Sequence, residues 1–277
     1  MVEVTLQGRD QVNRSIKTSL AVALLCALTL TLAGCRSHRD AVYQPKVNPQ
    51  FLNLSKEEIF QKGEDLYAKE KWAKCREWFT YVYENFPNDA LARRSLLRIA
   101  DAFQKQGGDV NLVEAQYKYR DFINRFPASE LADYATLQIA NVAFLQMERP
   151  DRDQAKTREA VQKYKEMLTL YPASPLRPEA VKNMGLAMDN LAQHEQIIAR
   201  FYMKRYDFTP ALTRLEGILR DYPDYSRKDD LFYDLGRSLA GLGRSGEARL
   251  YFERVITEYP SGEAATESKK QLEKLPA

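Results

Sequence analysis

Apolar positions recur along this chain in one pattern, which ends five times in an aromatic residue followed by proline. Twelve residues before each proline stands a small side chain, eight before it a large apolar one, and five before it another apolar one. Spacings of 4 and 3 residues place these side chains on one face of a helix that the proline ends. The aromatic-proline pairs are Phe86-Pro87, Phe126-Pro127, Tyr171-Pro172, Tyr222-Pro223 and Tyr259-Pro260.

The repetition of this helix predicts the fold class. A single helix cannot bury such a stripe alone, so neighbouring copies are expected to cover each other's apolar faces in an open array. The order of small residue, large residue and proline matches the second helix of a tetratricopeptide unit, and Gly63 and Gly236 stand where that unit places its close-contact glycine. We therefore predict an all-α tetratricopeptide-repeat solenoid of about five helical hairpins. The units end near Pro87, Pro127, Pro172, Pro223 and Pro260, and a polar capping helix follows Gly262.

Residues that favour helix ends refine this map. Ser55 and Glu58 form a capping-box pattern that starts the first helix, and Gly107-Gly108 separates two later helices. Ser129 is expected to cap the next helix, which should end before Arg149-Pro150-Asp151. An uninterrupted pattern from Pro178 to about Tyr206 predicts one helix of roughly 28 residues, about 42 Å long at 1.5 Å per residue. Thr209-Pro210 is expected to open the following helix, with threonine as N-cap, and Gly241 to Gly246 to form the last hairpin turn.

The N-terminus has the pattern of an export signal. Arg9, Arg14 and Lys17 precede an uncharged apolar stretch from Ser19 to Leu32, which is shorter than the roughly 20 residues that a membrane-spanning helix needs. The stretch ends in Leu32-Ala33-Gly34-Cys35, which resembles the lipobox of bacterial lipoproteins. That resemblance implies cleavage before Cys35, with a diacylglycerol on its sulfur and an acyl chain on its amine. The alternative is a signal peptide cut elsewhere that leaves Cys35 free.

These observations divide the chain into three parts. Residues 1–34 are the predicted signal peptide, residues 35–53 an acylated N-terminus with a flexible spacer, and residues 54–277 the repeat domain. The residue after the lipobox cysteine is Arg36. An aspartate at this position tends to retain lipoproteins in the inner membrane, and arginine does not match that signal. We therefore expect a lipid-anchored protein of the outer membrane that faces the periplasm. Cys75 is then the one cysteine left over, and its small-residue position predicts a packing role.

Composition and charge exclude several functional classes. Hydrophobic residues make up 44% of the chain and charged residues 29%, and the formal net charge of +3 is too weak to favour nucleic acid. The two histidines, His38 and His194, have no second histidine or cysteine at a metal-ligand spacing. Glycines are scattered in turns, so no phosphate-binding loop is present. We expect no catalytic residue, no metal and no cofactor other than the lipid on Cys35, and hence no enzyme.

Three segments of the chain carry a resemblance to a known family. They are Asp151-Arg152-Asp153-Gln154, Ile198-Ala199-Arg200-Phe201-Tyr202, and the run from Thr213 to Pro223, which is similar to the family's Arg-Val-Glu-Gly-Met-Leu-Arg-Asp-Tyr-Pro segment. The chain resembles the BamD family, the repeat lipoproteins of the outer-membrane β-barrel assembly machinery, from the lipobox to about residue 260. The resemblance implies a scaffold that binds the periplasmic domains of the insertase BamA and unfolded outer-membrane proteins. Other lipoproteins of the same machinery are further candidate partners.

The same resemblance implies two sets of site residues. The arginine that opens the Arg-x-Glu-Gly run lies in the family's contact with BamA, so the predicted BamA-binding residues are Arg214, Glu216, Arg220 and Asp221. The alternative for Arg214 is an ordinary pair within its own helix. The N-terminal hairpins are expected to form the client groove, and the candidate lining residues are Tyr67, Trp72, Trp78, Tyr81 and Tyr83. For these aromatic residues the alternative is a place in the core.

A different function on the same architecture stays open at this point. Another periplasmic adaptor lipoprotein, such as a secretin pilotin, would share the lipobox and the helical stack without the similarities between residues 150 and 225. Copurification of BamA or of a secretin from outer membranes discriminates between the two.

Overall fold

The computed structural model describes residues 49–276, and the signal segment, Cys35 and most of the spacer lie outside this range. The chain divides into residues 1–53, of which the 3-10 helix η1 (Pro49–Phe51) is described, and a repeat domain from Leu54 onward. The helices of the repeat domain are α2 (Lys56–Ala68), α3 (Trp72–Asn85), α4 (Ala90–Gln106), α5 (Asp109–Arg125), α6 (Ala132–Leu145), α7 (Ala155–Leu170), α8 (Arg177–Lys204), α9 (Phe208–Asp221), α10 (Lys228–Gly241), α11 (Ser245–Glu258) and α12 (Glu263–Lys274).

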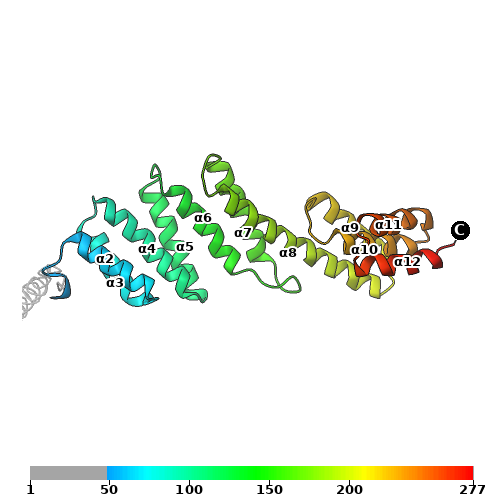
Figure 1. Ribbon diagram of the computed structural model, residues 1–277, viewed down its shortest axis with the longest axis horizontal. Coiled ribbons are helices and arrows are strands. Elements are labelled where there is room, and N and C mark those ends of the chain that lie inside the picture. Colours follow the sequence, from blue (N-terminus) through cyan, green and yellow to red (C-terminus); the bar gives the residue numbers. More distant parts are fainter. Residues whose placement is uncertain (1–48, 277) are drawn as a thin grey trace, which may run out of the picture. The chain divides into compact units, whose positions relative to one another are not determined.

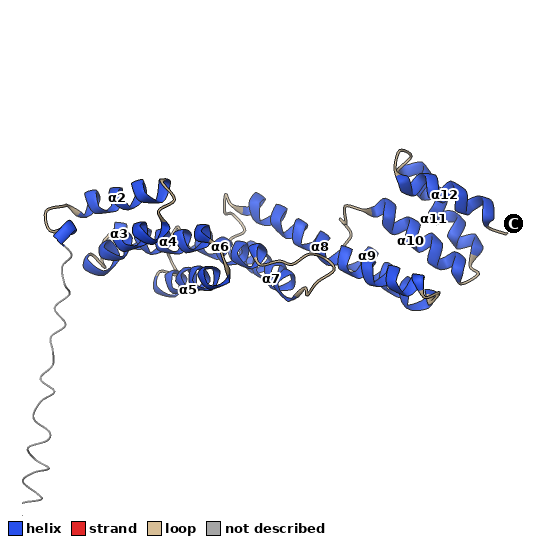
Figure 2. Ribbon diagram, turned by 90° about the horizontal axis from the view of Figure 1, so that it is seen from below, coloured by secondary structure: helices blue, strands red, loops and turns tan. Residues whose placement is uncertain are grey.

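The repeat domain is a series of five helical hairpins and a final helix. Each helix packs against the next one along the chain, from α2 through α12, and Figures 1 and 2 show this succession. The described residues contain no strand. The prediction of an all-α solenoid of about five hairpins with a capping helix is confirmed.

The repeated apolar pattern forms the core as predicted. All fifteen pattern positions have no exposed surface, including Cys75, Phe79 and Val82 of the first unit. In every unit the aromatic residue before proline is the C-cap, with φ between −127° and −132°. Its backbone N–H still donates to the carbonyl of the last apolar residue of the pattern, as the Phe86 N–H does to the Val82 carbonyl. The helix ends there because a residue before proline is sterically excluded from the helical conformation.

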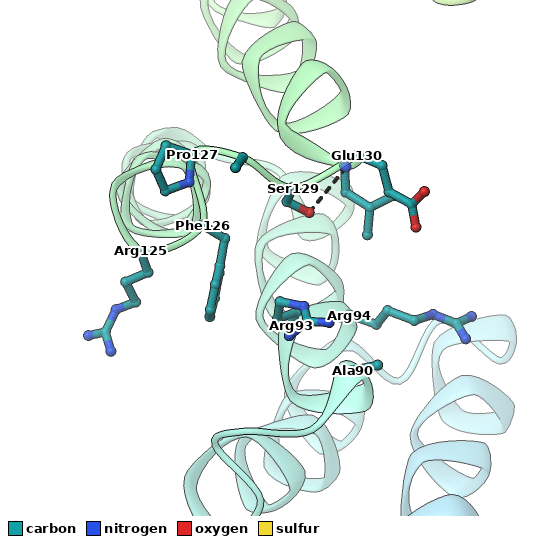
Figure 3. Close-up of a pocket in the computed structure, with 10 residues that line it drawn as sticks. Ala90, Arg93, Arg94, Arg125, Phe126, Pro127, Ser129 and Glu130 are labelled. Atoms are coloured by element: carbon teal, nitrogen blue, oxygen red, sulfur yellow. Dashed lines mark hydrogen bonds between the residues drawn. The ribbon is translucent and has the colours of Figure 1, made fainter.

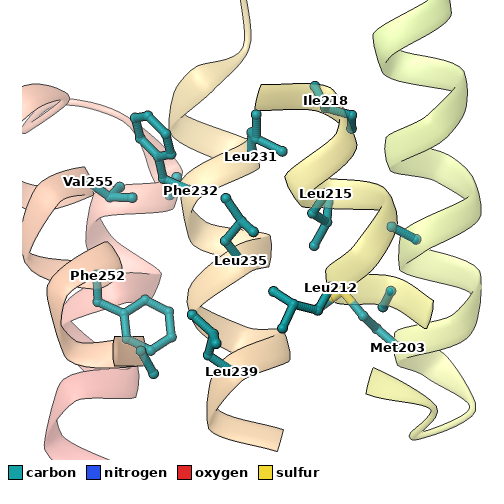
Figure 4. Packing of buried hydrophobic residues seen from close by; sticks show 14 of the residues in the cluster. Met203, Leu212, Leu215, Ile218, Leu231, Phe232, Leu235, Leu239, Phe252 and Val255 are labelled. Carbon is teal, nitrogen blue, oxygen red and sulfur yellow. The ribbon is translucent and has the colours of Figure 1, made fainter. Parts of the chain in front are cut away.

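Helix α8 belongs to the fourth hairpin and also contacts the third and the fifth. It packs against α7 and, over its C-terminal part, against α9 and α10. A large core cluster joins α8 to α9, α10, α11 and α12, and Figure 4 shows Met203, Leu215, Leu235 and Phe252 interdigitating within it. Its observed length of 28 residues confirms the predicted long helix.

The first helices of three hairpins end in the same hydrogen-bonded turn. After α2, α8 and α10, the second residue beyond the helix has a positive φ, and the next backbone N–H reaches back to a carbonyl in the last helical turn. The left-handed residues are Glu70 (φ 55°), Tyr206 (φ 59°) and Gly243 (φ 75°). The returning bonds run from Lys71 to Leu66, from Asp207 to Tyr202 and from Arg244 to Leu239. This is the Schellman arrangement, in which glycine is the favoured left-handed residue.

Several helix ends were predicted correctly. The capping box is present, because Ser55 Oγ accepts from the Glu58 N–H and the Glu58 carboxylate accepts from the Ser55 N–H. Gly107 and Gly108 both have positive φ and separate α4 from α5.

Other helix ends differ from the prediction. Helix α9 begins at Phe208 after Asp207, so Thr209 is not the N-cap and Pro210 is the third helical residue. Proline is tolerated there because the N–H groups of the first turn have no intrahelical acceptor. Helix α6 begins at Ala132, and Ser129 Oγ instead accepts from the Leu131 N–H in the preceding turn. The last hairpin turn is shorter than predicted, since α11 already begins at Ser245.

The segment Asp151-Arg152-Asp153-Gln154 organises the loop between α6 and α7. Gln154 is buried, and its side-chain amide donates to the carbonyls of Arg149 and Arg152. His194 of α8 contacts the Pro150 carbonyl through Nδ1 at 2.7 Å. In this chain the segment therefore has a structural role in the loop.

Cys75 has the predicted packing role. Its thiol is fully buried and donates to the Trp72 carbonyl, with 3.1 Å between sulfur and oxygen. Burial raises the thiol pKa to about 11.

Candidate functional site

A cavity of about 570 Å³ lies between α8 and α9 and brings together most of the predicted BamA-binding residues. Helix α8 contributes two side chains, and one face of α9 with its C-cap supplies the rest, at spacings of three and four residues. The lining residues are Glu195, Tyr202, Pro210, Thr213, Arg214, Gly217, Arg220, Asp221 and Tyr222. We refer to this feature as the Arg214 cavity.

Arg214 is held in this cavity by α8. Its Nη1 donates to Glu195 Oε2 at 2.5 Å, and its guanidinium carbon lies 5.9 Å from the centroid of the Tyr202 ring. The side chains of Arg214 and Glu195 are both about one third exposed. The alternative of a pair within α9 is therefore wrong, because the partner of Arg214 lies on the neighbouring helix.

Arg220 and Asp221 form a second pair at the edge of the same cavity. Arg220 donates to both oxygens of Asp221, at 2.8 and 2.9 Å. These hydrogen bonds raise the pKa of the Arg220 guanidinium and lower the pKa of the Asp221 carboxyl. Both side chains are exposed, so their charges are accessible to a partner.

Glu216 does not line the cavity. It is exposed on a different face of α9. Its charge contributes to the raised pKa of Arg244, whose main cause is the hydrogen bond to Glu247. Three of the four predicted residues therefore lie together, and Glu216 lies toward the turn before α11.

The five aromatic residues predicted for the client groove are all half-buried, but they do not gather in one place. Tyr67 and Trp72 contact each other edge to face across the α2–α3 turn, with ring centroids 5.0 Å apart. Tyr83 packs against the core of α4 and α5 and lies under the Arg125 guanidinium at 5.7 Å. Trp78 and Tyr81 lie between these two places on α3. Their predicted role in client binding stays a prediction.

A second large cavity, of about 600 Å³, is rich in arginine. It lies between α4, the end of α5 and the loop that leads to α6. Its lining residues are Ala90, Arg93, Arg94, Arg125, Phe126, Pro127, Ala128, Ser129, Glu130 and Leu131. Figure 3 shows the Phe126 ring between the side chains of Arg93 and Arg125. Arg125 pairs with Asp121 at 2.7 Å, whereas within residues 49–276 no carboxylate lies within ion-pair distance of Arg93 or Arg94.

A smaller cavity of about 220 Å³ continues this surface along α4. It shares Arg94 and Leu131 with the arginine-rich cavity and adds Leu97, Arg98, Asp101 and Tyr134. We call the two cavities together the α4 groove. Its residues Arg94, Leu97, Arg98 and Asp101 recur at helical spacing on one face of α4, a signal that the sequence contained and that the prediction from aromatic residues missed.

A buried carboxylate anchors the inner end of the α4 groove. Asp101 Oδ1 accepts from the hydroxyls of Tyr119 at 2.7 Å and Tyr134 at 2.8 Å. Arg98 donates to Asp101 at 3.3 Å and to both oxygens of Glu64, at 2.7 and 2.9 Å. Burial raises the Asp101 pKa, against the lowering effect of these hydrogen bonds. The network links α2, α4, α5 and α6 and fixes the groove's geometry.

The described part of the chain holds neither a metal site nor a membrane-spanning helix. No three His, Cys, Asp or Glu side chains there are placed to hold a metal ion. None of its helices combines the length and the apolar character needed to cross a bilayer.

Comparison with known proteins identifies relatives over most of the chain. A family model described as an outer membrane lipoprotein, YfiO, matches residues 53–243, and a tetratricopeptide-repeat model matches residues 230–262. The outer membrane protein assembly factor BamD of Haemophilus influenzae is 26% identical over 231 residues, which cover 76% of this chain and 78% of that protein. The BamD of Rickettsia prowazekii is 24% identical over 252 residues, covering 89% and 94%, and that of Caulobacter vibrioides 24% over 243 residues, covering 88% and 74%.

Among solved structures, the TPR2AB domain of yeast Sti1 aligns with a TM-score of 0.42 at 15% identity, over 79% of this chain and 83% of that one. The lipoprotein family model, in contrast, spans well over half of the chain and includes the whole Arg214 cavity. The family resemblance noted in the sequence is thus confirmed, and the chain belongs to the YfiO family of outer membrane lipoproteins.

Proposed function

We propose that this protein is a lipid-anchored scaffold of outer-membrane β-barrel assembly. In this proposal, Cys35 carries the lipid, the repeat domain faces the periplasm, and the Arg214 cavity binds a periplasmic domain of BamA. The proposal is supported by the family match and by curated relatives whose names describe them as outer membrane protein assembly factors. Unfolded outer-membrane proteins are the proposed clients, and the α4 groove is the proposed place for them.

The observation that carries the BamA part is the placement of Arg214 in an open cavity. An ion pair as exposed as Arg214–Glu195 adds little to folding stability. It does, however, hold the guanidinium in one place before a partner arrives, so less conformational entropy is lost on binding. A partner carboxylate that reaches the cavity gains a charge-assisted hydrogen bond with planar, directional geometry.

The α4 groove suits an extended chain. It offers apolar surface at Phe126 and Leu131, beside the guanidinium groups of Arg93 and Arg94, which have no carboxylate within ion-pair distance among residues 49–276. An extended segment lying along α4 can make several weak contacts of both kinds at once. Such contacts tolerate varied sequences, as a scaffold that handles many unfolded clients requires.

Binding to the purified periplasmic domains of BamA tests this function. We expect the wild-type repeat domain to bind, and Arg214→Glu to weaken binding by about 1.5–3 kcal/mol, because a charge-assisted bond is replaced by repulsion. Lys163→Glu is the matched control, because Lys163 also forms an ion pair of similar exposure, with Glu166 on α7. If a folded Arg214→Glu protein bound the BamA domains with unchanged affinity, the Arg214 cavity would not be the BamA-binding site. Copurification of a secretin in place of BamA would overturn the function as a whole.

A further inference from the structure

The turn between α8 and α9 carries a tyrosine in a conformation that favours glycine. Tyr206 has φ 59° and is 83% exposed. In the equivalent turn after α10 the same position is occupied by Gly243. A left-handed backbone costs free energy for a residue with a Cβ atom, and the side chain of Tyr206 recovers little of it by burial. Its ring touches the protein mainly through an edge-to-face contact with Phe208, at a centroid distance of 6.4 Å.

The surroundings of Tyr206 are apolar and positively charged. Phe201, one turn earlier on α8, is 55% exposed and lies under the Arg205 guanidinium at 5.5 Å. Lys204 and Arg205 are exposed, and no carboxylate of the described chain lies within ion-pair distance of either. Asp207 is the one acidic residue between Phe201 and Phe208. We call Phe201, Lys204, Arg205 and Tyr206 the aromatic turn.

The aromatic turn adjoins the Arg214 cavity. Phe201 meets Tyr202 edge to face, with ring centroids 5.9 Å apart, and Tyr202 lines the cavity beneath the Arg214 guanidinium. Pro210, two residues after Phe208, lines the cavity as well. A partner seated at Arg214 is therefore next to an uncovered apolar surface.

We propose that the aromatic turn is a second contact for the partner that docks at the Arg214 cavity. The inference rests on the proposed function, so that partner is a periplasmic domain of BamA. Such a contact requires an apolar depression on the partner that receives Tyr206 and Phe201, with acidic side chains around it. Rigid aromatic side chains supply large contact area at low entropy cost, and they are frequent among the residues that dominate interface energies. The exposed charges of Lys204 and Arg205, which form no ion pair within the described chain, select the acidic surroundings.

The strained backbone of Tyr206 provides a sharp test, because Tyr206→Gly separates folding from binding. Glycine relieves the left-handed strain, so we expect Tyr206→Gly to unfold at an equal or higher urea concentration than the wild type. The same substitution removes the aromatic ring, so we expect affinity for the BamA periplasmic domains to fall roughly tenfold. Glu70→Gly is the matched control, because it relieves the same strain in the α2–α3 turn and leaves BamA affinity unchanged.

The possible results discriminate between this inference and the function on which it rests. Suppose that the wild type binds BamA and Arg214→Glu does not. A double variant, Tyr206→Gly with Phe201→Ser, that keeps wild-type affinity would then overturn the role of the aromatic turn and leave the proposed function standing. If the wild type does not bind BamA, the proposed function fails and the inference fails with it. Binding to vesicles of anionic phospholipid is measured in parallel. A loss of vesicle binding by Tyr206→Gly at unchanged BamA affinity would assign the turn to the membrane surface and overturn the proposal.

Discussion

The backbone of Gly236 lies directly against the ring of Phe252. A Cβ atom added at Gly236 would stand 2.6 Å from Phe252 Cε1, closer than real Cβ contacts allow. The first hairpin repeats this relationship, since a Cβ at Gly63 would stand 2.6 Å from Phe79 Cε1. Both phenylalanines occupy the large position of the repeated pattern and are fully buried. Glycine therefore sets how closely the two helices of these hairpins approach.

Gly236→Ala should destabilise the protein although alanine is the better helix former. The added methyl group must displace the buried Phe252 ring, and overpacking of this kind costs about 1–3 kcal/mol. Gly185→Ala in α8 is the matched control, because nothing lies within 4 Å of its added Cβ. There we expect the ordinary gain of about 0.5–1 kcal/mol for replacing a helical glycine. Urea unfolding followed by circular dichroism measures both, and equal effects of the two substitutions would contradict the close approach.

Cys75→Ala should change how stability depends on pH at alkaline values. The folded-state thiol pKa is raised to about 11, from an ordinary value of about 8.5 in the unfolded chain. The folded state therefore binds the proton more tightly. Its stabilising effect is complete below the unfolded pKa and is lost as pH rises through the folded one. We expect wild type to lose stability relative to Cys75→Ala between about pH 8.5 and 11, in unfolding curves measured at several pH values. Alanine fits this position, as Ala115, Ala160, Ala211 and Ala248 show in the other units. A constant difference across this window would show that the thiol pKa is not raised.

Tyr134→Phe tests the network at the inner end of the α4 groove. It removes the hydroxyl that donates to Asp101 at 2.8 Å. A hydrogen bond to a charged group contributes about 1.5–3 kcal/mol, and the loss leaves Asp101 with fewer donors. Tyr164→Phe is the comparison, because the Tyr164 hydroxyl donates to the neutral amide oxygen of Asn141 at 2.7 Å. We expect the larger destabilisation for Tyr134→Phe at neutral pH. A smaller loss than that of Tyr164→Phe would indicate that Asp101 is not charged there.

Much of the fold was predictable because the information is local. The spacing of small, large and apolar residues before each proline fixes which face of each helix is buried, and all fifteen positions behaved as expected. Helix starts were harder to predict than helix ends. Pro210 was expected at the first helical position but is tolerated at the third, because the whole first turn lacks intrahelical acceptors.

Which residues come together in each site depends on contacts between segments that are distant in the sequence. Arg214 pairs with Glu195, 19 residues away on another helix, and only the crossing of α8 and α9 brings the two together. The client groove was predicted from aromatic residues of α2 and α3, whereas the described cavities in the N-terminal hairpins are lined by α4 and its neighbours. The sequence pattern shows which positions of each second helix are buried. It does not show which of the remaining positions contact a neighbouring helix.

Cys35→Ala should release the protein from the membrane without unfolding it. Cys35 lies outside the described residues, and no helix of the repeat domain includes it. Lipid chains contribute about 0.8 kcal/mol per buried methylene, so removing the acylated cysteine removes the anchor. We expect the variant in the soluble periplasmic fraction with an unchanged circular dichroism spectrum. Its recovery in the membrane fraction after a high-salt wash would show that another part of the chain holds it there.

Arg94→Glu and Trp72→Ala together test where unfolded clients bind. Arg94 lines both cavities of the α4 groove and has no carboxylate partner among residues 49–276, so its charge is available to a client. Trp72 contacts Tyr67 at the α2–α3 turn and represents the aromatic residues predicted from sequence. We expect Arg94→Glu to weaken binding of a urea-unfolded outer-membrane protein several-fold in fluorescence anisotropy, most strongly at low salt, because exposed charges are screened as ionic strength rises. Trp72→Ala should bind clients as wild type does, and both variants should keep their affinity for BamA. The reverse result, with loss only in a folded Trp72→Ala protein, would place the clients on the aromatic residues of α2 and α3 instead.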